Sequence, residues 1–229
     1  MNKGPVIFFG VLFIMAWSWY GIIGKNFQDL GHQDPIKLDT GEPYPGGRTG
    51  LAQAGQEVYR ANGCAACHTM QVRMKGYGRD IERGWGKRNS VLQDFVYDRH
   101  VFLGQVRVGP DLADMGTRNP DPIWHLMHLY NPRSVVPDSM MPQFPYLFTK
   151  KKIHGRRSAE ALPLPPKFQI EGYEIVPSAE AKALVAYLTG LHASIPIFEA
   201  PLLPPPPRRE APAPASTQPT NAPAVAHSK

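Results

Sequence analysis

The chain has only two cysteines, and both fall in one short run, Cys64-Ala65-Ala66-Cys67-His68. Two thiols at this spacing lie on one helical turn and can add to the two vinyl groups of one porphyrin. A histidine in the next position lies beneath the iron of that porphyrin and can ligate it. The run therefore predicts one covalently bound haem c, attached through Cys64 and Cys67 and ligated on one side by His68.

Two other uses of paired cysteines fit this sequence less well. A thioredoxin-like redox pair needs a strand-helix setting in an α/β domain, which the surrounding residues do not offer. A structural zinc site needs four ligands, and two cysteines with one histidine leave it short. The same cysteine count excludes a scaffold built on several disulfides.

The iron of a haem that transfers electrons normally has a second axial ligand, for which histidine and methionine are the usual choices. One kind of candidate lies in the apolar N-terminal stretch. Others follow His68, or a turn at residues 109–112, too closely in the sequence to reach the opposite face of the haem. Others fall in a helix predicted to begin after Pro122, and a wound element presents a ligand less readily than an extended loop. The candidates set aside for these reasons are Met15, Met70, Met74, Met115, His125, Met127 and His128.

The segment of residues 135–142 is the better source of the second ligand. Its two prolines force an extended path, and Met140 and Met141 lie within that path. Alternate residues of an extended segment point in opposite directions, so only one of the two can reach the iron without rearrangement. The other methionine is expected to pack around the edge of the haem.

Two predicted helices bracket these candidate ligands. Residues 52–62 form a short helical pattern in which Gly55 and Tyr59 stand four apart on one face. Near the other end, Ser178 can cap a second helix. Its apolar positions follow the i, i+4, i+7 spacing, at Leu184, Leu188 and Leu191.

The N-terminal part of the chain predicts a membrane anchor. Residues 5–24 contain no charged side chain and are flanked by Lys3 and Lys25, a length that matches one helical crossing of a bilayer. A cleaved signal peptide would have a shorter apolar region and a small-residue cleavage site. The expected organisation is a short tail at 1–4, a transmembrane helix at 5–24, a Pro/Gly-rich linker at 25–50, a haem domain at 51–199 and a Pro/Ala-rich extended tail at 200–229.

The composition predicts a loop-rich and basic protein. The 229 residues include 25 prolines and 21 glycines, which favour loops over long regular elements. The net charge is +6 and the isoelectric point about 9.3, which suits nucleic acid, a membrane surface or an acidic partner. Basic residues concentrate at 73–88 and at 150–157. Solvated loop charge is one account of them, and an ion pair between a haem propionate and Arg73, or a basic neighbour of it, is another.

Several of these features resemble c-type cytochromes in general. The resemblance implies an all-α, cytochrome c-like haem domain with long loops, in which Tyr187 of the last helix packs against Gly55 of the first. Gly109-Pro110-Asp111-Leu112 resembles the loop in which a proline carbonyl accepts the hydrogen bond of the proximal histidine. In haem proteins of this pattern the second ligand is the methionine directly before a proline, which implies Met141 rather than Met140.

A narrower resemblance, to the monohaem subunit (subunit II) of cbb3-type cytochrome c oxidases, covers residues 51–148. Departures are the order Met70-Gln71 and the segment between Arg83 and Tyr97. The resemblance is carried by His128-Leu129-Tyr130-Asn131-Pro132-Arg133-Ser134-Val135-Val136-Pro137, Met141-Pro142, Pro145-Tyr146-Leu147, Cys67-His68-Thr69, Val72-Arg73, Glu82-Arg83-Gly84, Tyr97-Asp98 and Arg107.

The resemblance implies a role for the chain. Such a subunit is no enzyme on its own: it passes single electrons from a soluble or multihaem cytochrome to the haem-copper catalytic subunit of a proton-pumping oxidase. It is a single-pass protein of the bacterial inner membrane with its haem domain in the periplasm, a location that removes nucleic acid as a partner. The alternatives are an independent tethered electron carrier and a cytochrome subunit of another complex, such as a nitric oxide reductase. A haem-based gas sensor would need a labile or absent sixth ligand, and the methionine loop argues against it.

Overall fold

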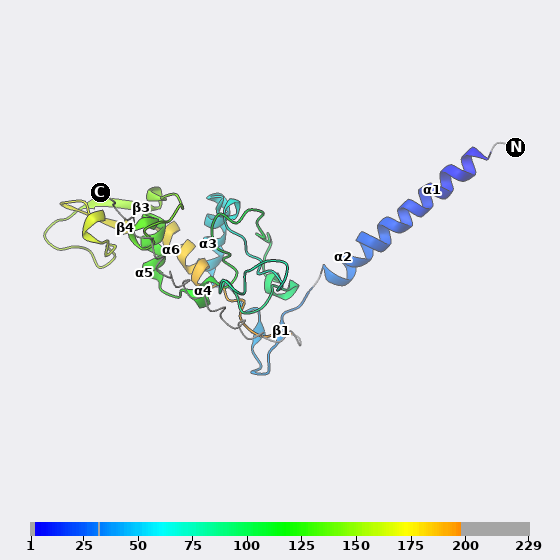
Figure 1. Cartoon of the computed structure of the whole chain (residues 1–229), viewed down its shortest axis with the longest axis horizontal. Coiled ribbons are helices and arrows are strands. Elements are labelled where there is room, and N and C mark those ends of the chain that lie inside the picture. Colours follow the sequence, from blue (N-terminus) through cyan, green and yellow to red (C-terminus); the bar gives the residue numbers. More distant parts are fainter. Residues whose placement is uncertain (1–2, 32, 198–229) are drawn as a thin grey trace, which may run out of the picture.

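The computed structural model describes residues 3–31 and 33–197 of the chain. Figure 1 shows two parts, a long N-terminal helix that projects outwards and a folded domain of short helices, long loops and small sheets. The Pro/Ala-rich tail predicted for residues 200–229 lies outside the described residues.

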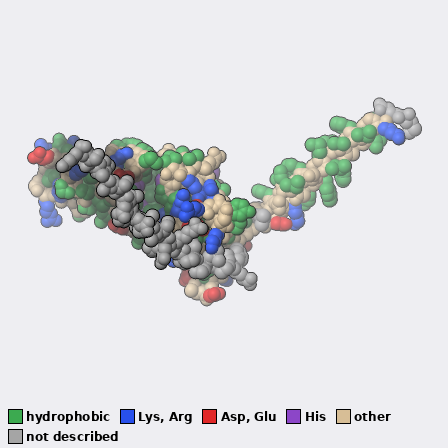
Figure 2. Space-filling model, in the orientation of Figure 1, with side chains coloured by type: hydrophobic (Ala, Val, Ile, Leu, Met, Phe, Trp, Pro, Cys, Tyr) green, Lys and Arg blue, Asp and Glu red, His purple; other side chains and the backbone are tan. Residues whose placement is uncertain are grey.

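The N-terminal helix is continuous through α1 (Gly4–Trp19), the π-helical turn η1 (Tyr20–Gly24) and α2 (Lys25–Leu30). Its span Gly4–Asp29 is 26 residues long with a hydropathy of 2.1, and its most apolar window is 0% buried. Apolar side chains cover the helix along its visible face (Figure 2). A helix of this length that is apolar and unburied can cross a membrane, and it contains the anchor predicted for residues 5–24.

Residues 25–50, predicted as a linker, contain regular structure of their own. The helix continues past residue 24, where Lys25 and Asp29 stand four apart and form an ion pair of 2.7 Å on its surface. A short antiparallel pair of strands follows, β1 (Ile36–Lys37) with β2 (Pro43–Tyr44). The end of this pair is then fastened to the folded domain.

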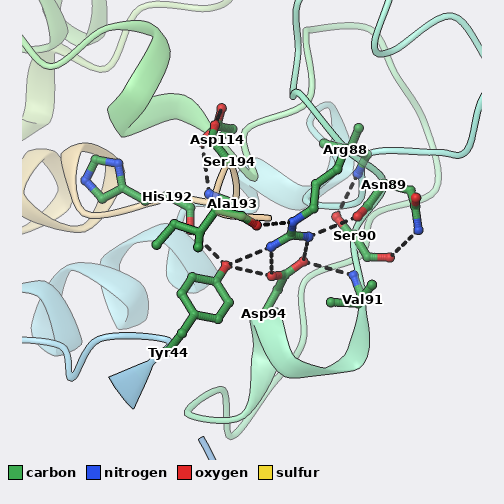
Figure 3. Close-up of polar contacts among 12 residues, drawn as sticks. Tyr44, Arg88, Asn89, Ser90, Val91, Asp94, Asp114, His192, Ala193 and Ser194 are labelled. Carbon is green, nitrogen blue, oxygen red and sulfur yellow. Dashed lines mark hydrogen bonds and ion pairs between the residues drawn. The ribbon is translucent and has the colours of Figure 1, made fainter. Parts of the chain in front are cut away.

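A buried polar cluster makes that attachment (Figure 3). The Arg88 guanidinium donates two hydrogen bonds to the Asp94 carboxylate, of 2.7 and 2.9 Å. The hydroxyl of Tyr44 donates to Asp94 at 2.6 Å, and Arg88 Nε donates to the carbonyl of Ile195 at 2.6 Å. A bidentate, buried pair of this kind is strong. It holds together the end of the linker, the loop of residues 88–94 and the chain that follows the last helix.

The centre of the domain is the contact between α3 (Gly50–Ala61) and α6 (Ala179–Thr189). A Cβ at Gly55 would overlap the carbonyl of Ala183 and lie 2.8 Å from Cβ of Tyr187. The two helices therefore approach as closely as their backbones allow, and only glycine fits at this position. The predicted packing of Tyr187 against Gly55 is confirmed.

Each of these helices begins at a side-chain cap. The hydroxyl of Thr49 accepts a hydrogen bond of 3.2 Å from the amide of Ala52. Ser178 does the same for Ala181, also at 3.2 Å, which confirms its predicted role. Such caps satisfy amides that have no partner within the helix.

The helix predicted after Pro122 is also present, as α5 (Pro122–Tyr130). The Asp121 carboxylate accepts from the amide of Ile123 at 2.9 Å and caps it. The other helical elements are α4 (Met115–Arg118) and the 3-10 turns η2 (Cys64–Ala66), η3 (Leu92–Phe95), η4 (Pro132–Ser134), η5 (Pro145–Leu147) and η6 (Pro166–Phe168).

The all-α expectation needs correction, because a second antiparallel pair of strands lies between α5 and α6. β3 (Phe148–Lys152) pairs with β4 (Tyr173–Pro177) over their full lengths. Ile175 and Val176 of β4 are buried, and such β-branched side chains favour an extended backbone. Most of β3 is solvent-exposed, and Lys150 lies over the Tyr173 ring. Helices are the main regular elements of the structure, joined by long loops and accompanied by two small sheets.

Candidate haem site

The two cysteines lie on one tight turn directly after α3. The helix ends at Asn62, and Gly63 then adopts a left-handed conformation with φ of 65°, which glycine accepts without strain. In the next turn the amides of Cys67 and His68 both donate to the carbonyl of Cys64, at 3.1 and 3.0 Å. Both thiols are free and partly buried. The turn holds the three predicted site residues close together, as their spacing required.

His68 is fixed by the loop that the sequence indicated. Its Nδ1 lies 2.7 Å from the carbonyl oxygen of Pro110. Because a carbonyl only accepts, Nδ1 carries the proton and Nε2 keeps a free lone pair. A Cβ at Gly109 would overlap the imidazole ring, so the backbone lies flat against it. Burial lowers the pKa of His68, which keeps this imidazole neutral.

Buried carboxylates support this loop from behind. Asp111 is fully buried and accepts from the Thr69 hydroxyl at 2.6 Å and from the amides of Gln71 and Ala113 at 2.8 and 2.9 Å. The guanidinium of Arg107 lies 3.7 Å from the same carboxylate. The loop after the haem motif and the loop of Pro110 are thus tied together.

The same guanidinium reaches a second buried carboxylate, so Arg107 bridges two acids. It pairs with Asp80 and donates to the carbonyl of Gln71 at 2.6 Å. Asp80 also accepts from the amide of Arg73 at 2.8 Å. A charge network of this kind needs all its partners, because a buried charge left alone is costly.

A cavity of about 420 Å³ opens beside His68. Its lining is largely apolar and comes from the haem-motif turn, the Pro110 loop, α5, the 136–142 loop and α6. The lining residues are Tyr59, Cys64, Cys67, His68, Val108, Gly109, Pro110, Leu112, Met115, Trp124, His125, His128, Leu129, Val136, Asp138, Ser139, Met140, Met141, Pro142, Leu184 and Leu188. All four predicted site residues, Cys64, Cys67, His68 and Met141, are therefore brought to one cavity.

The two candidate methionines differ in their exposure. Met140 is 77% exposed, whereas Met141 is partly buried and packs against the hydrophobic core. The alternation expected of an extended segment is visible here, because one side chain faces outwards and its neighbour inwards. Met141 is accordingly the better placed of the two.

Two buried polar atoms on the cavity wall indicate that the cavity suits a large ligand with polar groups at its edge. The hydroxyl of Tyr59 and Nδ1 of His128 are buried, have no hydrogen-bond partner in the described part of the chain, and belong to residues that line the cavity. Unpartnered buried polar groups are rare in native proteins and call for a missing partner. An apolar cavity with a free histidine nitrogen, two thiols and such groups has the chemistry that a haem requires.

The thiol of Cys64 is kept protonated before any bond is made. Burial raises the pKa of Cys64 to about 11, because an apolar wall disfavours a thiolate. A neutral thiol resists oxidation and metal capture. The cysteine therefore stays available for haem attachment.

The basic residues lie elsewhere. Neither lysine nor arginine is among the described residues that line the cavity. The side chain of Arg73 is exposed, so the structure does not bring it to the place where it was predicted to pair with a propionate. The basic run 150–157 lies on β3 and the loop after it, also away from the cavity wall.

Sequence reasoning missed two contributors to the wall, Trp124 and His128. Their rings stack at 4.7 Å with an interplanar angle of 7°. The spacing of four residues in a predicted helix was a signal that they share a face. His128 had been set aside as a ligand because it is helical, although a helical side chain can still face a cavity. Its neighbour His125 turns to the carbonyl of Asn119 instead, at 2.8 Å.

A cavity with a fixed histidine on one wall and a methionine on the other is typical of a haem protein that carries electrons. The chain matches the family described as Cytochrome C oxidase, mono-heme subunit/FixO over residues 7–164. It therefore belongs to that family, the monohaem subunit of cbb3-type cytochrome c oxidases, and takes part in electron transfer within an oxidoreductase complex. The match extends over both the N-terminal helix and the haem motif. No curated protein matches the chain.

Proposed function

We propose that the chain is a membrane-anchored c-type cytochrome that passes single electrons from a donor cytochrome to the haem-copper catalytic subunit of its oxidase. The observation that carries the proposal is the cavity that unites Cys64, Cys67, His68 and Met141. A bound haem supplies a centre that gains and loses one electron. The family match disfavours the two alternatives, a free tethered carrier and a subunit of nitric oxide reductase.

The two thiols are proposed to hold the haem covalently. Each S–H adds across one vinyl C=C bond, so that a C–S bond forms and the thiol proton ends on the neighbouring vinyl carbon. No oxidant is needed, because atoms and electrons balance in the addition. The short turn Cys64–Cys67 supports this, because both cysteines line the same cavity.

The two axial ligands are proposed to be His68 and Met141. Nε2 of His68 is the free nitrogen, since Nδ1 donates to Pro110 at 2.7 Å. That hydrogen bond fixes the ring and makes it a better donor to a metal. The inward packing of Met141 supports it as the second ligand, and a methionine ligand raises the reduction potential.

Covalent attachment is tested on the denatured full-length chain. Wild type should keep its haem through denaturation and show an intact mass increased by one haem. Variants Cys64→Ala and Cys67→Ala should each retain at most one linkage, and the double variant should release haem into acidified organic solvent. Haem that leaves the denatured wild-type chain would overturn the covalent assignment.

The role in the complex is tested by purification from membranes. The tagged chain should bring down a polytopic haem-copper subunit and a multihaem cytochrome c subunit, and the preparation should consume oxygen with a reduced cytochrome as donor. Removing Met141 should slow that oxygen consumption while the subunits still copurify. A chain that purifies alone and leaves oxidase activity intact in the remaining membrane would favour the independent carrier.

The orientation is proposed to be periplasmic, with the haem domain outside the bacterial inner membrane and the N-terminal helix as a single crossing. The support is that the domain follows one helix of 26 residues and carries a thiol pair suited to covalent haem. Protease added to intact spheroplasts should degrade the haem domain. Degradation only after lysis would contradict this orientation.

A further inference from the structure

His128 has a nitrogen that lacks a partner. Its Nδ1 is buried and makes no hydrogen bond to any described residue. Two other histidine nitrogens near the cavity have partners, His68 Nδ1 with Pro110 at 2.7 Å and His125 Nε2 with Asn119 at 2.8 Å. Because buried polar groups in native proteins are normally paired, the partner of His128 is expected in the cavity that its side chain lines.

The ring of His128 cannot easily turn to find a partner elsewhere. It stacks on the Trp124 indole, one helical turn earlier, at 4.7 Å and nearly parallel. Both rings line the cavity. Stacking against a large neighbour holds the imidazole plane, so Nδ1 has a fixed direction.

The backbone on both sides of His128 binds the loop that carries Met141. The carbonyl of Met127 accepts from the hydroxyl of Ser134 at 3.4 Å, where the loop leaves α5. The carbonyl of Leu129 accepts from the amide of Phe144 at 3.0 Å, where the loop returns. His128 therefore lies between the two attachment points of this loop, and both His128 and Met141 line the cavity.

His128 and His68 come from different parts of the cavity lining, α5 and the haem-motif turn. Among the described residues, the carbonyls on either side of His128 bond to the loop of the second ligand, and neither bonds to the turn of the first.

We propose that His128 is a positioning residue for the second ligand: its Nδ1–H donates a hydrogen bond to the sulfur of Met141. This inference rests on the proposed function, because it needs Met141 to be the ligand. A thioether sulfur is a weak acceptor, and a proton donated to it draws electron density from the bond to iron. Ferric iron needs that density more than ferrous iron does, so the hydrogen bond raises the reduction potential and fixes the orientation of the methionine.

Three substitutions of His128 in the full oxidase complex test the proposal. His128→Phe keeps a ring for Trp124 to stack on and removes both nitrogens. His128→Asn places an amide nitrogen near the position of Nδ1, whereas His128→Gln places it near Nε2. The readouts are the midpoint potential, the weak charge-transfer band between methionine sulfur and ferric iron, and the haem content.

The expected result is a lower potential and a shifted charge-transfer band in His128→Phe and His128→Gln, with both restored towards wild type in His128→Asn. Haem content should be equal in all four proteins, since the covalent attachment is untouched. A purely structural role for His128 would not be rescued by Asn alone, because Asn and Gln both replace the aromatic ring.

Three other results would each overturn the proposal. An unchanged band in His128→Phe means that Nδ1 does not contact the sulfur. A lowered potential with an unchanged band means that it bonds another group, such as a haem propionate. A high-spin haem in His128→Phe, with no sulfur band in wild type, means that His128 is itself the ligand. Loss of covalent haem from wild type would instead defeat the proposed function, so the two failures are distinguishable.

Discussion

The cavity wall that carries His68 is held by hydrogen bonds to buried carboxylates, whereas the wall that carries Met141 is an extended loop bonded to α5 near its two ends. On the first wall, Asp111 alone accepts three hydrogen bonds and is fully buried. On the second, Asp138 and Met140 are exposed to solvent. The first wall is therefore the more strongly fixed by hydrogen bonds within the protein.

The difference teaches how the two ligands are expected to behave. The histidine side is predicted to keep its geometry without the haem, because its hydrogen bonds close within the protein. The methionine side relies on packing and on the bond between Phe144 and Leu129 at 3.0 Å. Loops with few buried contacts open more readily than networked segments. Substitutions on the two walls should therefore differ in kind.

The largest effect is expected from Gly109→Ala on the histidine wall. The new Cβ would overlap the His68 imidazole and has no space to move into. Overpacking of this kind costs about 3 kcal/mol, and the histidine would be displaced from the iron. Absorption spectroscopy of the purified chain should show little low-spin haem.

Gly46→Ala is the matched control, since nothing lies within 4 Å of a Cβ there. It should keep normal haem content. A normal spectrum in Gly109→Ala would contradict the close packing of the loop on His68.

On the other wall, Met141→Ala should remove a ligand without disturbing the fold. We expect a high-spin or strongly shifted haem spectrum and a lowered potential. The loss of packing is about 2 kcal/mol, because the residue is only partly buried. Redox titration and thermal unfolding measure the two effects separately.

Met140→Ala is the companion variant, and its exposed side chain predicts an unchanged low-spin spectrum. The reverse pattern in this pair would make Met140 the ligand.

The substitutions Asp111→Asn and Asp138→Asn compare how much each wall contributes to stability. Asp111→Asn breaks a buried acceptor of three hydrogen bonds near Arg107, which should cost about 3 kcal/mol. Chemical denaturation of the holoprotein, followed by circular dichroism, measures the change. The exposed Asp138 on the methionine loop offers the same substitution, and Asp138→Asn should cost about 0.5 kcal/mol or less. Equal losses of stability in the two variants would contradict the difference between the walls.

Acidification should weaken the helix that borders the methionine wall. Burial lowers the pKa of His125, and its neutral Nε2 donates to Asn119 at 2.8 Å. The unfolded chain takes up a proton near pH 6.5 that the folded chain resists, so stability falls as pH drops below that value, by at most about 1.4 kcal/mol per unit. Denaturation at a series of pH values measures this slope.

His125→Gln keeps a donor at the same place and cannot titrate, so its slope should be flatter. His154→Gln, at an exposed position, should leave the slope as it is. Parallel slopes in all three proteins would remove His125 as the cause.

The smallest effect is expected from Arg73→Ala. The side chain is exposed and absent from the cavity lining, and its backbone amide, which bonds Asp80 at 2.8 Å, is retained. Redox titration should give a potential indistinguishable from wild type. A clear decrease would restore the predicted ion pair with a propionate.

The histidine wall could be predicted from the sequence because its chemistry is local. The thiols and His68 fall within five residues of one turn, and the resemblance to c-type cytochromes implied that the carbonyl of Pro110 accepts the hydrogen bond of the imidazole. The hydrogen bonds that stiffen this wall could not be predicted, because Asp80, Arg107 and Asp111 meet only after the chain has folded. No spacing rule links Arg107 to Asp80, 27 residues earlier, or Asp111 to Thr69, 42 residues earlier.

For the methionine wall, the path of the chain could be predicted from the sequence, but the side chains packed around it could not. The prolines predicted the extended path, alternation predicted that one of two methionines reaches the iron, and the resemblance to c-type cytochromes implied Met141. The contribution of His128 could not be predicted. It depends on the unpaired Nδ1 and on the stacked Trp124 ring, and both become apparent only in the folded structure. The strands β3 and β4 were missed for a similar reason, since β3 is a lysine-rich segment with no apolar alternation.

The polar cluster around Arg88 has a consequence for where the haem domain can go. It fixes Tyr44 to the domain, so the chain between the end of α2 and Tyr44 would reach at most roughly 45 Å even if fully extended, and the β1–β2 pair shortens that reach. With the N-terminal helix as the proposed anchor, the domain is confined to a thin layer above the bilayer. A partner held in the same membrane is then met by a search across a surface rather than through a volume.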